Sequence, residues 1–428
     1  MEMMLRMFLL AALMLAVVSA DTAAAKPVTF VFGDSLTEVG NNNYLQSLAK
    51  ANYPYYGIDY EGGRATGRFT NGRTIGDIIC TSVFIPYQTL LPPCLSISFI
   101  FFTLNCCLVL MEISCNSTRC GFAAEKLGIP SPPPYLSLAP NDDKFLEGVN
   151  YASGGAGILN DTGLYFVIIS PSPSTITLQD GPSKYEQQIQ QKCLLQIQRL
   201  SFDDQIESFN KTKQAIVGKI GQAAADRFSN KALYFIGIGS NDYVNNFLQP
   251  FLPDGLQYTH DEFVELLAST LEKQLKRLYK LGARKMIVHG LGPLGCIPSQ
   301  RMKSTTGGCL KKVNQWVLEF NAQVQNLTTS LGRQLPKSQV VFADTYNAVL
   351  DLITKPSTYG FKISNTSCCN VDTKLGGLCS PNSKVCQNRH DYVFWDSFHP
   401  SDAANAVLAN YIFTSLFTKA PSPAPAPK

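Results

Sequence analysis

Five short apolar segments divide the chain, and each of them ends in a turn rich in glycine or polar residues. None of the five alternates regularly between apolar and polar residues. Such continuous apolar runs are typical of strands that are buried on both faces, as in a parallel sheet. The predicted strands are residues 28–32, 148–152, 232–238, 285–289 and 339–343.

Helical patterns lie between the predicted strands. The clearest covers residues 261–281, where apolar side chains recur every three or four residues and Gly282 marks the end. Its apolar stripe consists of Phe263, Leu266, Leu267, Leu271, Leu275 and Leu278. Because strands and helices alternate, we expect a three-layer α/β domain in which helices cover both faces of a parallel sheet.

Two segments break this pattern. Residues 81–121 interrupt a helical pattern that begins at Thr74, and residues 167–196 mix Ser-Pro pairs with a Gln-rich run. Deleting the first segment would restore one continuous amphipathic helix. We interpret it as foreign to the fold, translated from unspliced or misannotated sequence. A genuine family-specific loop is one alternative, and a membrane-spanning helix at residues 94–111 is another, although polar residues and the lack of a basic flank weaken the latter.

The ends of the chain predict export. Arg6 precedes an apolar stretch of roughly 12 residues, and the small residues at 18–20 form a cleavage site. A membrane anchor is the alternative, but such a stretch is too short to cross about 30 Å of hydrocarbon. We therefore expect a signal peptide at residues 1–20, a single domain over residues 27–418 and a solvated Pro-rich tail at residues 420–428.

Composition limits the classes of function. In a chain of 428 residues, 45% hydrophobic residues suffice for a large core, which excludes a disordered protein. The net charge is only +4 and the basic residues do not cluster, so a nucleic-acid partner is not expected. In a secreted protein, the Asn-x-Ser/Thr sequons would be candidate N-glycan sites. They lie at Asn116, inside the first interruption, and at Asn160, Asn210, Asn326 and Asn365.

The thirteen cysteines divide into two sets. Seven lie in or beside the interruptions, and the other six form two compact groups in the C-terminal half. An even set in an exported chain favours local disulfides; a zinc site is the alternative, but no histidine lies at zinc-finger spacing. The six are Cys296, Cys309, Cys368, Cys369, Cys379 and Cys386.

His399 is the best candidate for a general base among the four histidines, because Asp396 precedes it by three residues. In a turn, this spacing can bring the carboxylate to Nδ1 and leave Nε2 free to accept a proton. Ser35 lies just beyond the carboxyl end of the first predicted strand, where parallel α/β sheets bind their ligands. We expect it to open a helix, whose first N–H groups would face a developing negative charge. The alternative is that Asp34 or Ser35 only caps that helix.

Two further strand ends offer hydrogen-bond donors. Gly154, Gly155 and Gly157 follow the second predicted strand and would let backbone N–H groups approach a substrate closely. Asn241 follows the third predicted strand and offers a side-chain amide. Taken singly, each is an ordinary turn. Together with Ser35 and His399 they place a nucleophile, oxyanion donors and a base at separate strand ends in chain order.

These four blocks resemble those of the GDSL, or SGNH, hydrolases. The strings at residues 32–44 and 393–400 are similar to the plant GDSL esterase/lipase branch, and the resemblance covers residues 27–417 apart from the two interruptions. It implies a flavodoxin-like α/β/α fold and ester hydrolysis without a metal or cofactor.

The resemblance also implies the roles of individual residues. Ser35 would be the nucleophile, His399 the base and Asp396 the group that orients it. The amide of Ser35, the amide of Gly155 and the side chain of Asn241 would form the oxyanion hole, with Gly154 and Gly157 as alternatives for the glycine.

The sequence thus predicts an esterase or lipase that is secreted to the cell exterior (cell wall or apoplast) and acts on a small-molecule ester or a lipid. No stable membrane span is expected. The alternative is a binding or structural protein of the cell exterior whose SGNH site is a relic. Substrate identity and acyl-chain preference do not follow from these motifs.

Overall fold

A computed structural model describes residues 28–81, 131–164, 198–250, 252–370 and 378–417. The predicted signal peptide, the Pro-rich tail, residues 94–111, Asn116 and, apart from Thr81, both interruptions lie outside these ranges. Within the described ranges, no helix combines the length and the apolar character that a membrane span requires.

The five predicted strands form one parallel sheet with the order β2-β1-β3-β4-β5. This order is that of a flavodoxin-like doubly wound sheet, which confirms the expected fold class. The strands are β1 (Thr29–Gly33), β2 (Gly148–Asn150), β3 (Leu233–Gly237), β4 (Lys285–His289) and β5 (Gln339–Ala343).

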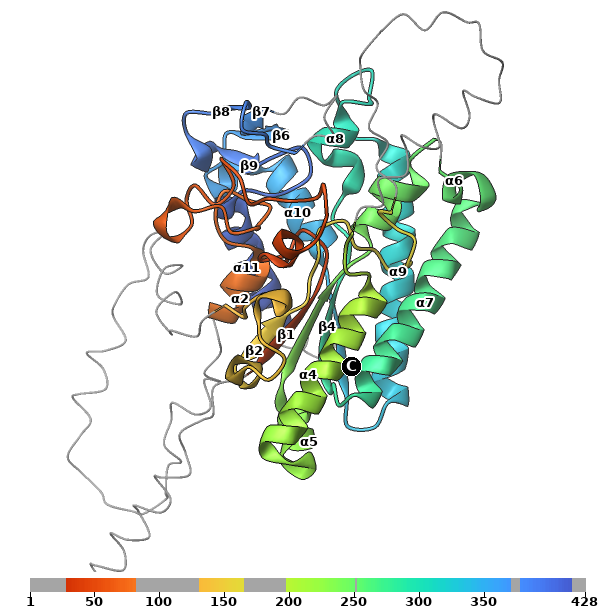
Figure 1. The fold of residues 1–428 in the computed structure, drawn as a ribbon. Helices are drawn as coiled ribbons and strands as arrows, with labels where there is room; N and C mark the ends of the chain where they lie inside the picture. The colour runs from red at the N-terminus through yellow and green to blue at the C-terminus, as the bar shows by residue number, and fades with distance from the viewer. Residues whose placement is uncertain (1–27, 82–130, 165–197, 251, 371–377, 418–428) are drawn as a thin grey trace, which may run out of the picture.

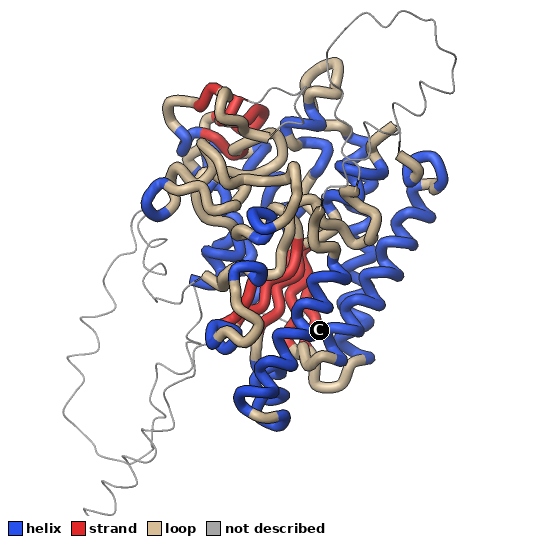
Figure 2. Tube along the Cα trace, viewed as in Figure 1, coloured by secondary structure: helices blue, strands red, loops and turns tan. Residues whose placement is uncertain are grey.

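Helices cover both faces of the sheet, as expected for strands without apolar–polar alternation (Figure 1). On one face lie α2 (Ile75–Thr81), α10 (Thr345–Thr354) and α11 (Asp402–Phe417), and on the other α4 (Phe202–Ile220), α7 (His260–Lys280) and α9 (Lys311–Gln334). The other α-helices of the described ranges are α5 (Gln222–Lys231), α6 (Asp254–Gln257) and α8 (Pro298–Arg301). Figure 2 shows the strands enclosed between these helical layers.

Helix α7 confirms the clearest helical prediction. Thr259 and Glu262 form a reciprocal capping box that starts the helix one residue earlier than expected, and the helix stops just before Leu281. Most of the predicted stripe is buried, for example Phe263 and Leu271, whereas Leu266 is only partly buried. The stripe packs toward the sheet and so fixes the orientation of the helix.

Beyond the main sheet, the C-terminal part carries two small strand pairs, seen at the upper left of Figure 1. They consist of β6 (Ile363–Ser367) with β9 (Tyr392–Phe394), and β7 (Cys369–Asn370) with β8 (Lys384–Val385). The six cysteines assigned to disulfides are all paired, so the zinc alternative is wrong for them. The pairs are Cys296–Cys309, Cys368–Cys386 and Cys369–Cys379.

A buried ion pair joins helix α2 to the loop before it. Arg68 donates from Nε and Nη2 to the two carboxylate oxygens of Asp77, each at 2.8 Å. Both side chains are almost completely buried, and Thr74 donates to the same carboxylate from its amide and its hydroxyl. Breaking such a pair leaves a charge uncompensated in the interior. Phe69, next to Arg68, packs against the His399 ring, so this pair supports one wall of the site described below.

We predict that Arg68→Met lowers the free energy of unfolding by about 3–5 kcal/mol, because the buried Asp77 carboxylate loses its countercharge. Chemical denaturation at pH 7 measures this loss. The control is Lys362→Met, which breaks an exposed pair with Asp391 and is expected to cost about 1 kcal/mol or less. Equal losses in the two variants would contradict the prediction.

Candidate active site

The carboxyl end of β1 is fixed from two sides. The amide of Gly33 donates to Gln205 Oε1 at 2.9 Å, and Gln205 Nε2 donates back to the Gly33 carbonyl at 2.8 Å. A Cβ atom at Gly33 would lie 2.4 Å from the carbonyl oxygen of Gly237 on the neighbouring strand, so only glycine fits this approach. Because β1 lies between β2 and β3, its end is the switch point where ligands bind in doubly wound sheets. Asp34 and Ser35 follow there.

The expected helix after Ser35 does not form. Residues 35–37 make a single turn, in which the amides of Thr37 and Glu38 donate to the Asp34 carbonyl. The chain then turns inward because Glu38 accepts from the amides of Asn42 and Gly154, while Asn41 and Asn42 donate to buried carbonyls. These tertiary hydrogen bonds stabilise the inward turn more than the hydrogen bonds of a continued helix would. Asp34 Oδ1 accepts from the Leu36 amide, so a local cap exists without a helix.

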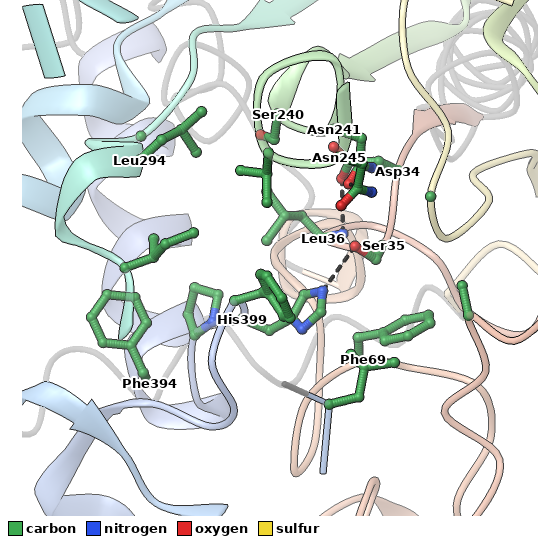
Figure 3. Close-up of a pocket in the computed structure, with 18 of the residues that line it drawn as sticks. Asp34, Ser35, Leu36, Phe69, Ser240, Asn241, Asn245, Leu294, Phe394 and His399 are labelled. Carbon is green, nitrogen blue, oxygen red and sulfur yellow. Dashed lines mark hydrogen bonds between the residues drawn. The ribbon is translucent and has the colours of Figure 1, made fainter. Parts of the chain in front are cut away.

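The structure brings Ser35, His399 and Asp396 together in one chain of hydrogen bonds. Figure 3 shows the bond between Ser35 and His399. His399 Nε2 lies 2.8 Å from Ser35 Oγ, and His399 Nδ1 lies 2.8 Å from each oxygen of Asp396. Asp396 and His399 are buried, whereas Ser35 is partly exposed at the cavity wall. A serine, an imidazole and a carboxylate in this order can activate the hydroxyl for attack on a carbonyl.

Backbone amides hold the Asp396–His399 turn closed. The amides of Phe398 and His399 donate to Asp396 Oδ1 at 2.8 and 2.9 Å, so the carboxylate caps its own turn. The His399 ring packs against Phe69, with ring centroids 5.1 Å apart. The three-residue spacing therefore acts as expected from the sequence, and it places the carboxylate at Nδ1.

Ser35, Gly155 and Asn241 line the same cavity. Gly155 has a φ of +86°, which favours glycine, and within the described chain neither its amide nor that of Ser35 has a hydrogen-bond acceptor. Gly154 instead donates to Glu38, and neither Gly154 nor Gly157 lines this cavity. Of the three glycines, Gly155 is thus the one whose amide is available to a ligand in this cavity.

The orientation of the Asn241 amide is set by two neighbours. Asn241 Nδ2 donates to the Ala156 carbonyl at 2.9 Å, and Asn241 Oδ1 accepts from Asn245 Nδ2 at 2.8 Å. The second N–H of the Nδ2 group remains for a ligand. Asn245 lies in the π-helical turn Asp242–Phe247, which follows β3.

The cavity has a volume of about 380 Å³ and its walls are mainly apolar. This volume lies within the range of ligand sites for small molecules. In Figure 3, Leu294 and Phe394 lie on one side of His399, and Phe69 lies on the other. The apolar lining consists mainly of Leu48, Tyr53, Phe69, Ile75, Val244, Leu294, Ile297, Val349, Leu378, Phe394, Phe398 and Leu408.

One group of possible metal ligands occurs among the described residues, and it lies outside this cavity. Donor atoms of His260, Asp261 and Glu319 lie within 4.8 Å of one another. His260 stacks on Trp316 and its Nδ1 lies 3.0 Å from Glu319 Oε2, while the Asp261 side chain is fully exposed. Stacking on Trp316 and a hydrogen bond between His260 Nε2 and the Tyr243 hydroxyl, 3.2 Å apart, hold this histidine in its place.

Comparison with known proteins decides the family. The model of the GDSL-like Lipase/Acylhydrolase family matches residues 116–412. The chain is also 56% identical to GDSL esterase/lipase At5g37690 of Arabidopsis thaliana over 424 residues, which cover 97% of this chain and 98% of that relative. This chain belongs to the plant GDSL esterase/lipase family.

Further relatives from the same plant carry the same family name. GDSL esterase/lipase At1g74460 is 39% identical over 94% of this chain and 92% of its own length, and GDSL esterase/lipase 7 is 36% identical over 92% of this chain and 90% of its own length. The resemblance seen in the sequence motifs is therefore confirmed, and with it the membership in a family of ester hydrolases.

Three side chains that support the site were not predicted from the sequence. Gln205 fixes the end of β1, Glu38 fixes the glycine loop, and Tyr56 donates to Asp396 Oδ2 at 2.7 Å. All three are buried and bond to groups far away in the chain. No local pattern marks them, since Gln205 lies on an ordinary amphipathic helix and Tyr56 lies among other tyrosines.

Burial raises the pKa of Asp34 to about 7, although its bond from the Leu36 amide acts in the opposite direction. Between about pH 4 and 7 the carboxyl group of Asp34 is therefore protonated in the folded protein and ionised in the unfolded chain. The folded state then binds more protons, so the free energy of unfolding falls as the pH rises through this window.

We predict that Asp34→Asn removes this contribution. The difference in free energy of unfolding between D34N and wild type should shift by about 2–3 kcal/mol in favour of D34N from pH 5 to pH 8. The reason is that the amide keeps the acceptor for Leu36 but cannot ionise. Thermal unfolding at the two pH values measures the change. Glu265→Gln, which alters an exposed carboxylate on α7, should follow the wild-type pH dependence. A D34N curve parallel to wild type would contradict the prediction.

Proposed function

We propose that this protein is a serine esterase or lipase that hydrolyses carboxylic esters through an acyl-enzyme on Ser35. The observation that carries the proposal is the distance of 2.8 Å between Ser35 Oγ and His399 Nε2, with Asp396 at the opposite nitrogen. Membership in a family of ester hydrolases supports the same reaction.

The reaction would proceed in two acyl-transfer steps. His399 Nε2 takes the proton of the Ser35 hydroxyl as Oγ attacks the ester carbonyl carbon. When the tetrahedral intermediate collapses, the C–O bond to the leaving alcohol breaks and His399 donates the proton to that oxygen. Water then repeats the sequence on the acyl-enzyme, releasing the acid and freeing Ser35. Asp396 stabilises the imidazolium form of His399 in both steps.

The negative oxygen of the intermediate would be stabilised by the amides of Ser35 and Gly155 and by the side chain of Asn241. Each such donor contributes on the order of 3 kcal/mol when it is aimed at the developing charge. The orientation of Asn241 by Ala156 and Asn245 supports this role, because an amide fixed before the reaction needs no reorganisation. The mainly apolar cavity is suited to an ester with an apolar acyl or alcohol group.

Ser35→Ala and Asp396→Asn test the proposal. With a series of p-nitrophenyl esters of increasing acyl length, we expect each variant to lose about 10³–10⁴-fold in kcat, because the nucleophile or the orientation of its base is lost. Labelling with a fluorophosphonate probe should mark the wild type and not the S35A variant.

Ser269→Ala is the matched control, since within the described ranges its hydroxyl bonds only to the Leu266 carbonyl on α7. It should hydrolyse the esters and react with the probe like wild type. If S35A keeps wild-type esterase activity, the assignment fails. If folded wild type neither hydrolyses the esters nor reacts with the probe, the protein is the relic-site binding protein instead.

We further propose that the protein is secreted to the cell exterior. The N-terminal pattern at residues 1–20 supports this, as do three disulfides, which form in oxidising compartments. Of the sequons in the described chain, those at Asn160, Asn326 and Asn365 have exposed asparagines, and Asn210 is half-buried.

Expression of the full chain in plant cells tests this proposal. We expect the protein in the extracellular fluid with its N-terminus at Asp21 and with a mass that falls on treatment with an N-glycan-specific amidase. Asn326→Gln together with Asn365→Gln should reduce that mass loss in proportion to the sites removed. Retention inside the cell with residues 1–20 still attached would refute secretion.

A further inference from the structure

We infer that Tyr56 is a positioning residue for the catalytic base, acting through Asp396; this inference rests on the proposed function. The Tyr56 hydroxyl lies 2.7 Å from Asp396 Oδ2, and the side chain is 1% exposed. It reaches the carboxylate from a loop that lies 340 residues earlier in the chain. Its hydroxyl bonds to one of the two oxygens that also face His399 Nδ1.

The direction of this hydrogen bond is fixed by a second one. The Cys379 amide lies 3.1 Å from the Tyr56 oxygen, and an amide can only donate. The Tyr56 oxygen therefore accepts from Cys379, and its own proton points to the carboxylate. Burial, together with the neighbouring Asp396 charge, raises the pKa of Tyr56 well above its ordinary value, so the donor is retained across the working pH range.

The surroundings hold the hydroxyl in place. The Tyr56 ring packs edge-on against Tyr53 and Phe69, and the following Gly57 amide donates to the Thr70 carbonyl.

On the other side, Cys379 is joined to Cys369, whose amide donates to the Trp395 carbonyl just before Asp396. The donor to Tyr56 and the carboxylate that Tyr56 contacts are thus tied to the same piece of backbone.

This arrangement gives Tyr56 a specific effect on the base. Without the Tyr56 proton, Asp396 Oδ2 keeps only His399 Nδ1 as a partner among the described residues, and the carboxylate is then positioned by the two amides at Oδ1 alone. Its charge is also compensated by fewer donors, so it attracts the protonated imidazole more strongly. His399 should then become neutral, and able to act as a base, only at higher pH.

Other titratable groups near the pair are Asp34, which interacts with the His399 charge, and Tyr53, whose pKa burial and Asp396 raise to about 12. Tyr53 stays neutral at working pH. Asp34 ionises in the same range as histidine, but it is present in wild type and variant alike. A difference between the two pH profiles therefore reports on Tyr56.

Tyr56→Phe tests the inference. Using p-nitrophenyl butyrate, we expect kcat to fall about tenfold with KM within twofold of wild type, as for the loss of one hydrogen bond to a charged group. The acidic limb of the profile of kcat/KM against pH should move upward by about half a pH unit. The ¹H NMR resonance of the proton between His399 Nδ1 and Asp396 should titrate at correspondingly higher pH.

Tyr234→Phe is the matched control, because it removes an equally buried hydroxyl whose partner is the Ser229 carbonyl. It should leave kcat, the acidic limb and the NMR titration unchanged. The inference is overturned if Y56F matches Y234F, or if Y56F loses only stability. The NMR titration does not need turnover, so it decides on Tyr56 even if Ser35→Ala shows that the proposed hydrolysis is wrong.

Discussion

The positions of the other site residues depend on the backbone of Gly33, which is fixed by hydrogen bonds and by close packing. Gln205 bonds to both its amide and its carbonyl, and the Gly237 carbonyl fills the space where a side chain would lie. These contacts fix the end of β1 and hence the direction in which Ser35 leaves the sheet. His399, Gly155 and Asn241 come from other segments, so each must be positioned relative to this point.

The two halves of the site are positioned in different ways. Around Ser35, strand pairing fixes the end of β1, and the buried Gln205 and Glu38 side chains fix the turn and the glycine loop by bonding to backbone groups. Around His399, the need to satisfy a fully buried carboxylate with donors determines the arrangement. Asp396 obtains them from two amides of its own turn, from His399 and from Tyr56.

Much of the fold and of the candidate site could be predicted from the sequence. The features that could not be predicted share one physical cause. The strands of the sheet, helix α7 and the Asp396–His399 contact depend on local patterns, such as apolar runs, caps and a three-residue spacing. The helix expected after Ser35 failed because Glu38, Asn41 and Asn42 bond to distant segments. The roles of Gln205 and Tyr56 could not be predicted for the same reason. Their hydrogen-bond partners are distant in sequence and become neighbours only in the folded protein, so no local sequence pattern indicates them.

Ser35 and His399 are 364 residues apart and yet share a hydrogen bond. Nearly the whole chain must therefore leave the ribosome and fold before the two side chains can meet. Under the proposed mechanism the serine lacks its base until then, and an emerging chain would not yet hydrolyse the lipids and esters around it. Because Ser35 and His399 lie near opposite ends of the chain, the proposed ester hydrolysis could begin only when folding is nearly complete.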